Sequence, residues 1–235
     1  MRVCVINFSG NVGKTTVAAN MLTPRMGATL FSVESLNQDA AGDNVEVQRL
    51  RAERYGQLQK QALEHESVVV DVGASNAQMF LEMMGEYTDS HRDYDYFVVP
   101  TVKARKQTAD TLNTIQALRN LGIEPNRIRV LFNKVGQRDV LAEDFEQLIG
   151  LAARGTCVLN DDAKLMENEV FELIKDSDQS LAQVIADPTD HREELRHETT
   201  PEGKSARIDR LALKRLSTSC ALNMDRAYAA LFASQ

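Results

Sequence analysis

The stretch that decides the fold of this chain is Ser9-Gly10-Asn11-Val12-Gly13-Lys14-Thr15-Thr16. An apolar run typical of a buried strand, Val3–Ile6, precedes it, and a run with a helical pattern, Val17–Leu22, follows it. Gly10 and Gly13 allow the backbone to turn so that successive N–H groups point at one anion. A strand, a glycine-containing turn and a helix in this order predict a phosphate-binding loop.

Different residues of the loop are expected to bind different parts of a nucleoside triphosphate. We expect Lys14 to reach the β- and γ-phosphates, Thr15 to give its hydroxyl to Mg²⁺, and the helix N-terminus to add positive charge. The predicted nucleotide-binding residues of the loop are Gly10, Asn11, Val12, Gly13, Lys14, Thr15 and Thr16.

The loop departs from the standard pattern G-x-x-x-x-G-K-[ST], which requires a glycine where this chain has Phe8. The compressed pattern K-G-G-x-G-K-T fits better. Its first lysine falls on Ser9 and its second glycine on Asn11.

The composition indicates a globular protein. The chain has 235 residues, of which 43% are hydrophobic and 26% charged, and its net charge is -7. This charge argues against a broadly basic surface, so we do not expect direct DNA binding. The cysteines Cys4, Cys157 and Cys220 have neither disulfide nor metal-site spacing. No apolar stretch is long enough to span a bilayer or to serve as a signal peptide, and we therefore expect a cytoplasmic protein.

Apolar runs alternate with helical patterns, which predicts an α/β fold: a three-layer sandwich with a mainly parallel sheet flanked by helices. The predicted strands are Arg2–Asn7, Ala28–Val33, Ser67–Val72, Tyr94–Val99, Arg127–Phe132 and, more weakly, Thr156–Leu159. Predicted helices include one with Thr108, Leu112, Ile115 and Leu118 on a single face, one with Val140, Leu141, Phe145, Leu148 and Ile149, and one with Met166, Val170, Leu173 and Ile174.

The composition changes near residue 187. We expect a nucleotide-binding domain over 1–186, a mobile linker over 187–203 and a helical appendage over 204–235. The last helix has an apolar stripe and a basic first half. Two interpretations remain open: a helix packed on the domain, or an arm that binds a partner or forms a dimer.

A second strand end supplies the acid that such a site requires. The run Ser67-Val68-Val69-Val70-Asp71-Val72-Gly73 is β-branched and ends in an aspartate and a glycine. In a phosphate-loop protein the parallel strand beside the first one ends in an aspartate near Mg²⁺. We therefore predict Asp71 as a metal residue with Thr15, and Gly73 as the donor of an N–H to the γ-phosphate.

Two further strand ends carry polar side chains. Glu34, Asp39 and Asp43 follow the second strand, where a carboxylate can position the attacking water, and the sequence does not choose among them. Asn133 ends the fifth strand, where its amide can pair with the adenine edge. The guanine pattern N-K-x-D would require an aspartate where this chain has Gly136, so ATP is favoured over GTP.

In this order the loop, Asp71-Val72-Gly73, Val98-Val99-Pro100 and Asn133 resemble the deviant Walker ATPases of the ParA/MinD type. Residues 7–16 and 71–76 look more narrowly like plasmid-stability proteins of the StbB kind. The resemblance covers about residues 1–185. It implies ATP and Mg²⁺ as cofactors, a nucleotide-dependent homodimer, and a role in plasmid partition or positioning, sometimes tied to conjugation, with a small plasmid-encoded DNA-binding partner.

Two departures affect what this resemblance implies. The family's first loop lysine crosses the dimer interface, and here Ser9 stands in its place. Cations after the fourth predicted strand are candidate substitutes, namely Lys103, Arg105 and Lys106. The family's D-x-D-P-Q segment corresponds to residues 34–38, so that its second acid is Leu36. Either hydrolysis is slow, or Asp39 acts as the catalytic acid with Lys14 and Asp71.

Overall fold

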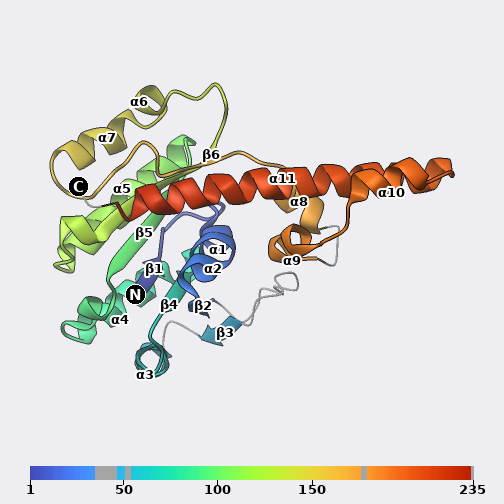
Figure 1. Ribbon diagram of the computed structural model, residues 1–235. Helices are drawn as coiled ribbons and strands as arrows, with labels where there is room; N and C mark the ends of the chain where they lie inside the picture. Colours follow the sequence, from blue (N-terminus) through green and yellow to red (C-terminus); the bar gives the residue numbers. More distant parts are fainter. Residues whose placement is uncertain (35–46, 51–53, 176–178, 234–235) are drawn as a thin grey trace.

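The computed structural model describes residues 1–34, 47–50, 54–175 and 179–233. Within these residues a parallel sheet of seven strands has the order β3-β2-β4-β1-β5-β6-β7 (Figure 1). β1 (Arg2–Val5) is central, between β4 (Val68–Val72) and β5 (Tyr96–Thr101). All the pairs are parallel, so the strands share one carboxyl edge, where the phosphate loop follows β1. The predicted fold class is confirmed.

The remaining elements alternate along the chain. The other strands are β2 (Thr29–Val33), β3 (Val47–Leu50), β6 (Ile128–Val135) and β7 (Lys164–Met166). The helices before β6 are α1 (Lys14–Thr16), the π-helical η1 (Val17–Leu22), α2 (Thr23–Met26), α3 (Tyr55–Leu63), α4 (Ala74–Glu86), η3 (Ser90–Asp93), α5 (Arg105–Asn120) and η4 (Pro125–Arg127). Those after it are α6 (Leu141–Asp144), α7 (Glu146–Ala153), α8 (Val170–Lys175), α9 (Leu181–Ala186), α10 (His191–His197) and α11 (Pro201–Leu231).

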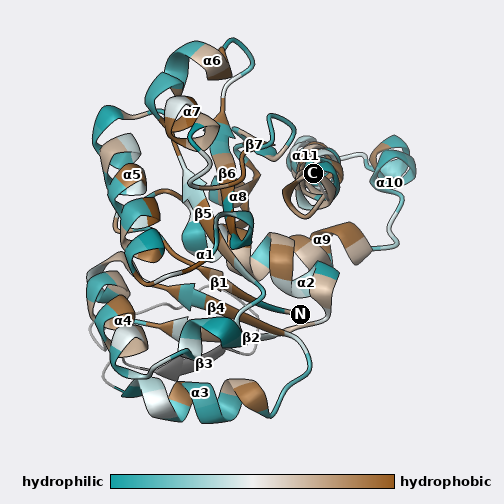
Figure 2. Ribbon diagram, turned by 90° about the vertical axis from the view of Figure 1, so that its left-hand side faces the viewer, coloured by the Kyte–Doolittle hydropathy of each residue, from teal (hydrophilic) through white to brown (hydrophobic). Residues whose placement is uncertain are grey.

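The sheet separates two apolar cores. Successive residues of β1 point to opposite faces: Cys4 joins the core beneath α3, α4, α5 and α7, and Val3 and Val5 join the core beneath η1, α9 and α11. Figure 2 shows α4 and α5 on one side of the sheet and α2, α9 and α11 on the other. The central strands are buried on both faces, which explains why they read as continuous apolar runs.

The sheet differs from the prediction at its β7 edge. Residues 156–159 do not form a strand and contribute a single parallel bridge between Val158 and Arg129. The edge strand is β7 instead, so Met166 lies in a strand and not on the helix with Val170. A strand of three residues is too short to produce a periodic pattern, and β3 at the opposite edge, Val47-Gln48-Arg49-Leu50, has no apolar run.

The predicted linker contains a helix. α10 occupies part of 187–203, and the carboxylate of Asp190 caps it by accepting the N–H groups of Arg192 and Glu193. The helix is mostly polar and shows no apolar stripe in the sequence, so composition did not predict it, and the cap stabilises it locally. The division of the chain into domain, linker and appendage stays a prediction.

The last helix packs on the sheet over its second half. There it buries the stripe Ser217, Cys220, Met224, Ala227 and Leu231 in the second core. Its first half extends away from the sheet with α10 beside it (Figure 1). None of the helices within the described ranges is long and apolar enough to cross a membrane.

Truncation of this stripe should reduce the stability of the protein. Met224 is 1% exposed, so Met224→Ala should lower the free energy of unfolding by about 2–5 kcal/mol through lost burial and a cavity. Leu222 lies on the same helix but is 55% exposed, and Leu222→Ala should change it by at most about 0.5 kcal/mol. Urea unfolding of both variants checks this, and equal losses would show that α11 is not docked by this face.

Candidate nucleotide-binding site

The phosphate loop has a backbone that few side chains tolerate. Asn11 and Gly13 have φ values of 59° and 81°, in the left-handed region. A Cβ on Gly13 would lie 2.2 Å from the Nδ2 atom of Asn133, whereas a Cβ on Gly10 would meet nothing within 4 Å. Gly13 is therefore required for conformation and for space, and its carbonyl accepts the N–H of Val17 at the start of the helix (2.9 Å).

Lys14 folds back beneath the loop. Its Nζ atom donates a hydrogen bond to the carbonyl of Ser9 (2.6 Å), and the residue is 7% exposed. Burial lowers the pKa of Lys14, and the nearby carboxylate of Asp71 partly opposes this shift. The ammonium group is thus held among backbone atoms of the loop, where an arriving phosphate can replace the Ser9 carbonyl as its partner.

Thr15 and Asp71 meet as predicted from their positions at neighbouring strand ends. The Thr15 hydroxyl donates to Oδ2 of Asp71 (2.7 Å), and Asp71 is 2% exposed. β4 presents this carboxylate because Asp71 pairs in register with Val5, the last residue of β1. A hydroxyl and a carboxylate oxygen beside a phosphate loop are ligands that suit Mg²⁺, so the residues present fit the predicted metal.

A buried polar network, which the sequence analysis missed, anchors the start of the loop. The Asn7 amide donates to the Pro100 carbonyl (2.9 Å) and the Thr111 hydroxyl (2.8 Å), and its Oδ1 accepts the N–H of Ser9 (2.8 Å). Thr114 accepts the N–H of Phe8 (3.0 Å). The signal that could have revealed this network is the spacing of threonines on α5, because Thr108, Thr111 and Thr114 lie on its buried face.

Asn133, on β6, contacts the backbone of the phosphate loop. Its Nδ2 donates to the Val12 carbonyl (2.9 Å), its Oδ1 accepts the N–H of Lys134 (2.9 Å), and the residue is 8% exposed. The amide is therefore engaged with the backbone in this structure. Contact with adenine stays a prediction, and it would require this amide to exchange the Val12 carbonyl for the base.

Gly73, the predicted donor to the γ-phosphate, connects the end of β4 to the end of β2. The N–H of Gly73 donates to the carbonyl of Val33 (2.9 Å), the last residue of β2. A Cβ on Gly73 would lie 3.1 Å from the same carbonyl, which explains the glycine. Glu34 follows Val33 directly, and the other candidate acids of this segment, Asp39 and Asp43, lie outside the described residues with Leu36.

The three candidate substitutes for the loop lysine differ in their surroundings. Lys103 forms an ion pair with Asp139 (2.6 Å), and this pair raises the pKa of Lys103 and lowers that of Asp139. Arg105 and Lys106 begin α5, are exposed, and have no ion pair within the described part of the chain. They are the candidates that remain available to a partner.

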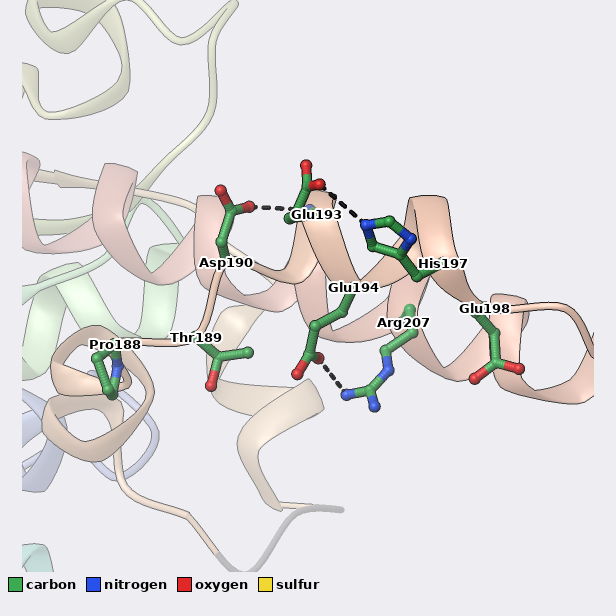
Figure 3. Close-up of a pocket in the computed structure, with 8 residues that line it drawn as sticks. All are labelled: Pro188, Thr189, Asp190, Glu193, Glu194, His197, Glu198 and Arg207. Atoms are coloured by element: carbon green, nitrogen blue, oxygen red, sulfur yellow. Dashed lines mark hydrogen bonds and ion pairs between the residues drawn. The ribbon is translucent and has the colours of Figure 1, made fainter.

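A separate hollow of about 660 Å³ lies between α10 and α11, and its lining is drawn in Figure 3. Its charged side chains are already paired: Glu193 binds His197 (3.1 Å), and Glu194 binds Arg207. The first pair lies within α10, and the second joins α10 to α11. The hollow shares no lining residue with the phosphate loop, and we assign it a structural role.

Comparison with known families supports the assignment from geometry. Residues 3–175 match the family model of the CobQ/CobB/MinD/ParA nucleotide binding domain. The chain belongs to this family. The predicted resemblance to ParA/MinD-type proteins is confirmed at this level. The residues of the candidate nucleotide site, from the phosphate loop to Asn133, lie within the matched range.

Solved structures of this family share the fold. The cell division ATPase MinD of Pyrococcus furiosus is 15% identical, with a TM-score of 0.53 over 91% of this chain and 98% of that one. A ParA family ATPase of Chlorobium tepidum is 13% identical, with a TM-score of 0.51 over 94% and 97%. A comparison with curated protein sequences gave no match. At such low identity, these structures establish the fold of the CobQ/CobB/MinD/ParA domain here and nothing finer.

The different environments of the two loop glycines can be tested. Gly13→Ala should lower the free energy of unfolding by about 1–2 kcal/mol from the positive φ alone, and further because Asn133 must move. Gly10→Ala has open space and should change it by at most about 0.5 kcal/mol. Urea unfolding without nucleotide is the measurement, and equal effects would contradict the loop conformation.

Proposed function

We propose that this protein is an ATP-dependent molecular switch that acts in plasmid stability, partition or positioning. The observation that carries the proposal is the hydrogen bond between Thr15 and Asp71 beside the buried ammonium of Lys14. The narrower proposal is that the protein is StbB-like, with a role in plasmid stability that is sometimes tied to conjugation. It rests on the resemblance of residues 7–16 and 71–76 to StbB proteins.

In this proposal the chain's own residues hold ATP through its phosphates. Lys14 and the backbone N–H groups of the loop bind the phosphate oxygens, and Thr15 and Asp71 hold Mg²⁺. Mg²⁺, when bound, offsets the negative charge of the phosphates. Gly136 in place of the guanine-reading aspartate supports ATP over GTP.

The proposed switch is the hydrogen bond between Gly73 and Val33. A γ-phosphate that accepts the Gly73 N–H would release the Val33 carbonyl and thereby change the end of β2. The segment after Glu34 would then respond to the state of the nucleotide. Because Leu36 replaces the family's second acid, we expect slow hydrolysis unless Asp39 acts in its place.

The proposed output is a nucleotide-dependent homodimer that acts with a small plasmid-encoded DNA-binding partner. Support comes from the resemblance and from the exposed cations Arg105 and Lys106, which lie at the carboxyl edge of the sheet. Either could reach a second copy in place of the lysine that Ser9 replaces.

The oligomeric state tests the switch. Light scattering after size exclusion should show a dimer with ATP·Mg²⁺ and a monomer with ADP·Mg²⁺ or no nucleotide, while phosphate release gives the hydrolysis rate. Lys14→Ala should bind no ATP and stay monomeric, because the ammonium group is lost. Lys106→Ala, if it still dimerises, excludes Lys106 as the substitute.

The same experiment separates the alternatives. Dimerisation without phosphate release would favour a scaffold that binds ATP and does not hydrolyse it. A monomer that binds ATP would favour a small-molecule enzyme of the same fold. Unchanged ATP affinity in Lys14→Ala would contradict the site itself.

The metal assignment predicts a second result. Asp71→Asn should remove the enhancement of ATP affinity by Mg²⁺, with a loss of about tenfold or more, because the carboxylate charge is gone. Asp209→Asn changes an exposed aspartate on α11 and should leave the enhancement intact. Calorimetric titration with ATP, with and without Mg²⁺, checks both. An enhancement that survives in Asp71→Asn would exclude Asp71 from the metal site.

A further inference from the structure

A second hollow lies at the amino edge of the sheet, opposite the phosphate loop. Its volume is about 680 Å³, and it is bounded by residues at the starts of β1, β5 and β6 and in the turns before β5 and β6. The lining residues are Met1, Arg92, Asp95, Tyr96, Asn126, Arg127 and Arg129. None of them contributes to the candidate nucleotide site.

Arg129 is an unusual member of this lining. It lies on β6 and is 7% exposed, yet its Nε atom has no hydrogen-bond partner in the part of the chain that the structure describes. Its guanidinium makes a long hydrogen bond from Nη1 to the Ala233 carbonyl (3.4 Å) and lies 5.0 Å from the centre of the Tyr96 ring. Within the described residues no carboxylate forms an ion pair with it.

A guanidinium group in this position is energetically costly. Arginine keeps its charge under all physiological conditions, so Arg129 cannot avoid the cost of burial by losing a proton. A buried charge normally has an ionic partner, and contact with an aromatic ring replaces only part of that interaction. Among the residues that the structure describes, the environment of Arg129 therefore holds no anion that pairs with it.

The surrounding charges also favour an anion. Arg127 donates to the backbone carbonyls of His91 (2.9 Å) and Asp95 (3.3 Å), which are neutral acceptors that leave its charge unbalanced. Asp95 is the single carboxylate among the lining residues, and its Oδ2 already accepts the backbone N–H of Arg2 (2.6 Å). Of the three lining arginines, Arg92 forms an ion pair with Asp89 (3.2 Å), which leaves Arg127 and Arg129 with Asp95 as their one carboxylate in the lining.

We propose that this hollow binds an oxyanion of the phosphate class, with Arg129 at its buried side and Arg127 and Asn126 around it. Guanidinium groups match phosphate because their planar N–H groups donate to two oxygens at once. Free phosphate and a phosphate group carried by a small molecule share this chemistry, and the two probes named below distinguish them. The proposal is independent of the nucleotide site.

Calorimetric titration of the Lys14→Ala protein tests this, because the phosphate loop is disabled in that background. Inorganic phosphate and phenyl phosphate are the probes. We expect saturable binding of phenyl phosphate, weakened at least tenfold by Arg129→Gln and left unchanged by Arg154→Gln, which removes an exposed arginine elsewhere. Equal affinity for the two probes would identify free phosphate as the source of the oxyanion, and tighter binding of phenyl phosphate would identify a phosphorylated small molecule.

A second variant covers the case in which Arg129→Gln does not fold. Asn126 is exposed, so Asn126→Asp leaves the core intact and adds a negative charge beside the hollow. This variant should weaken binding at least tenfold by repulsion. The absence of saturable binding to the Lys14→Ala protein, or binding that Asn126→Asp leaves unchanged, would overturn the proposal.

Discussion

The parallel pairing of β1 with β4 is the constraint on which the candidate site depends. This register sets Val5 opposite Asp71, so the loop that follows β1 begins next to the one carboxylate of β4. The 2.7 Å hydrogen bond from Thr15 to Asp71 is a consequence of that pairing. A slip of one residue would turn Asp71 to the other face of the sheet and place an apolar side chain in its position. The slip would also move the Asp71 carboxylate away from Thr15 and toward apolar side chains, and the cost of burying that charge helps to hold the register.

The sequence was sufficient to predict the central fold and the phosphate end of the site. Buried parallel strands read as β-branched runs, and the glycines, Lys14 and Thr15 follow the first of these runs at a fixed spacing. Asp71 was predictable for the same reason, since the geometry of parallel strands brings their carboxyl ends together. The fold and the contact between Thr15 and Asp71 follow from local patterns and one general rule of topology, whereas the nucleotide and metal roles of these residues stay predictions.

Other features depend on contacts between distant residues, which no local pattern encodes. Asn7 and Thr111 are far apart in the sequence, and only the packing of α5 beside β1 makes them partners at 2.8 Å. The contact of the Asn133 amide with the Val12 carbonyl depends likewise on the close approach of β6 to Gly13, which the local sequence does not show. The edge strand β7 and the capped helix α10 were missed because short elements carry too few residues to show a period.

Lys14 and Arg129 are both buried cations, and they have opposite relations to their surroundings. Lys14 has a carbonyl acceptor at 2.6 Å and the carboxylate of Asp71 nearby, so the protein itself compensates its charge before any phosphate arrives. Arg129 is buried to the same 7% exposure at the other edge of the sheet, with an aromatic ring and one long hydrogen bond for support. A site that must release its ligand needs an internal substitute for that ligand, as Ser9 provides for Lys14. Arg129 has no comparable acceptor within the described residues, so an anion that binds in the hollow would offset a cost of burial that the protein's own groups offset only in part.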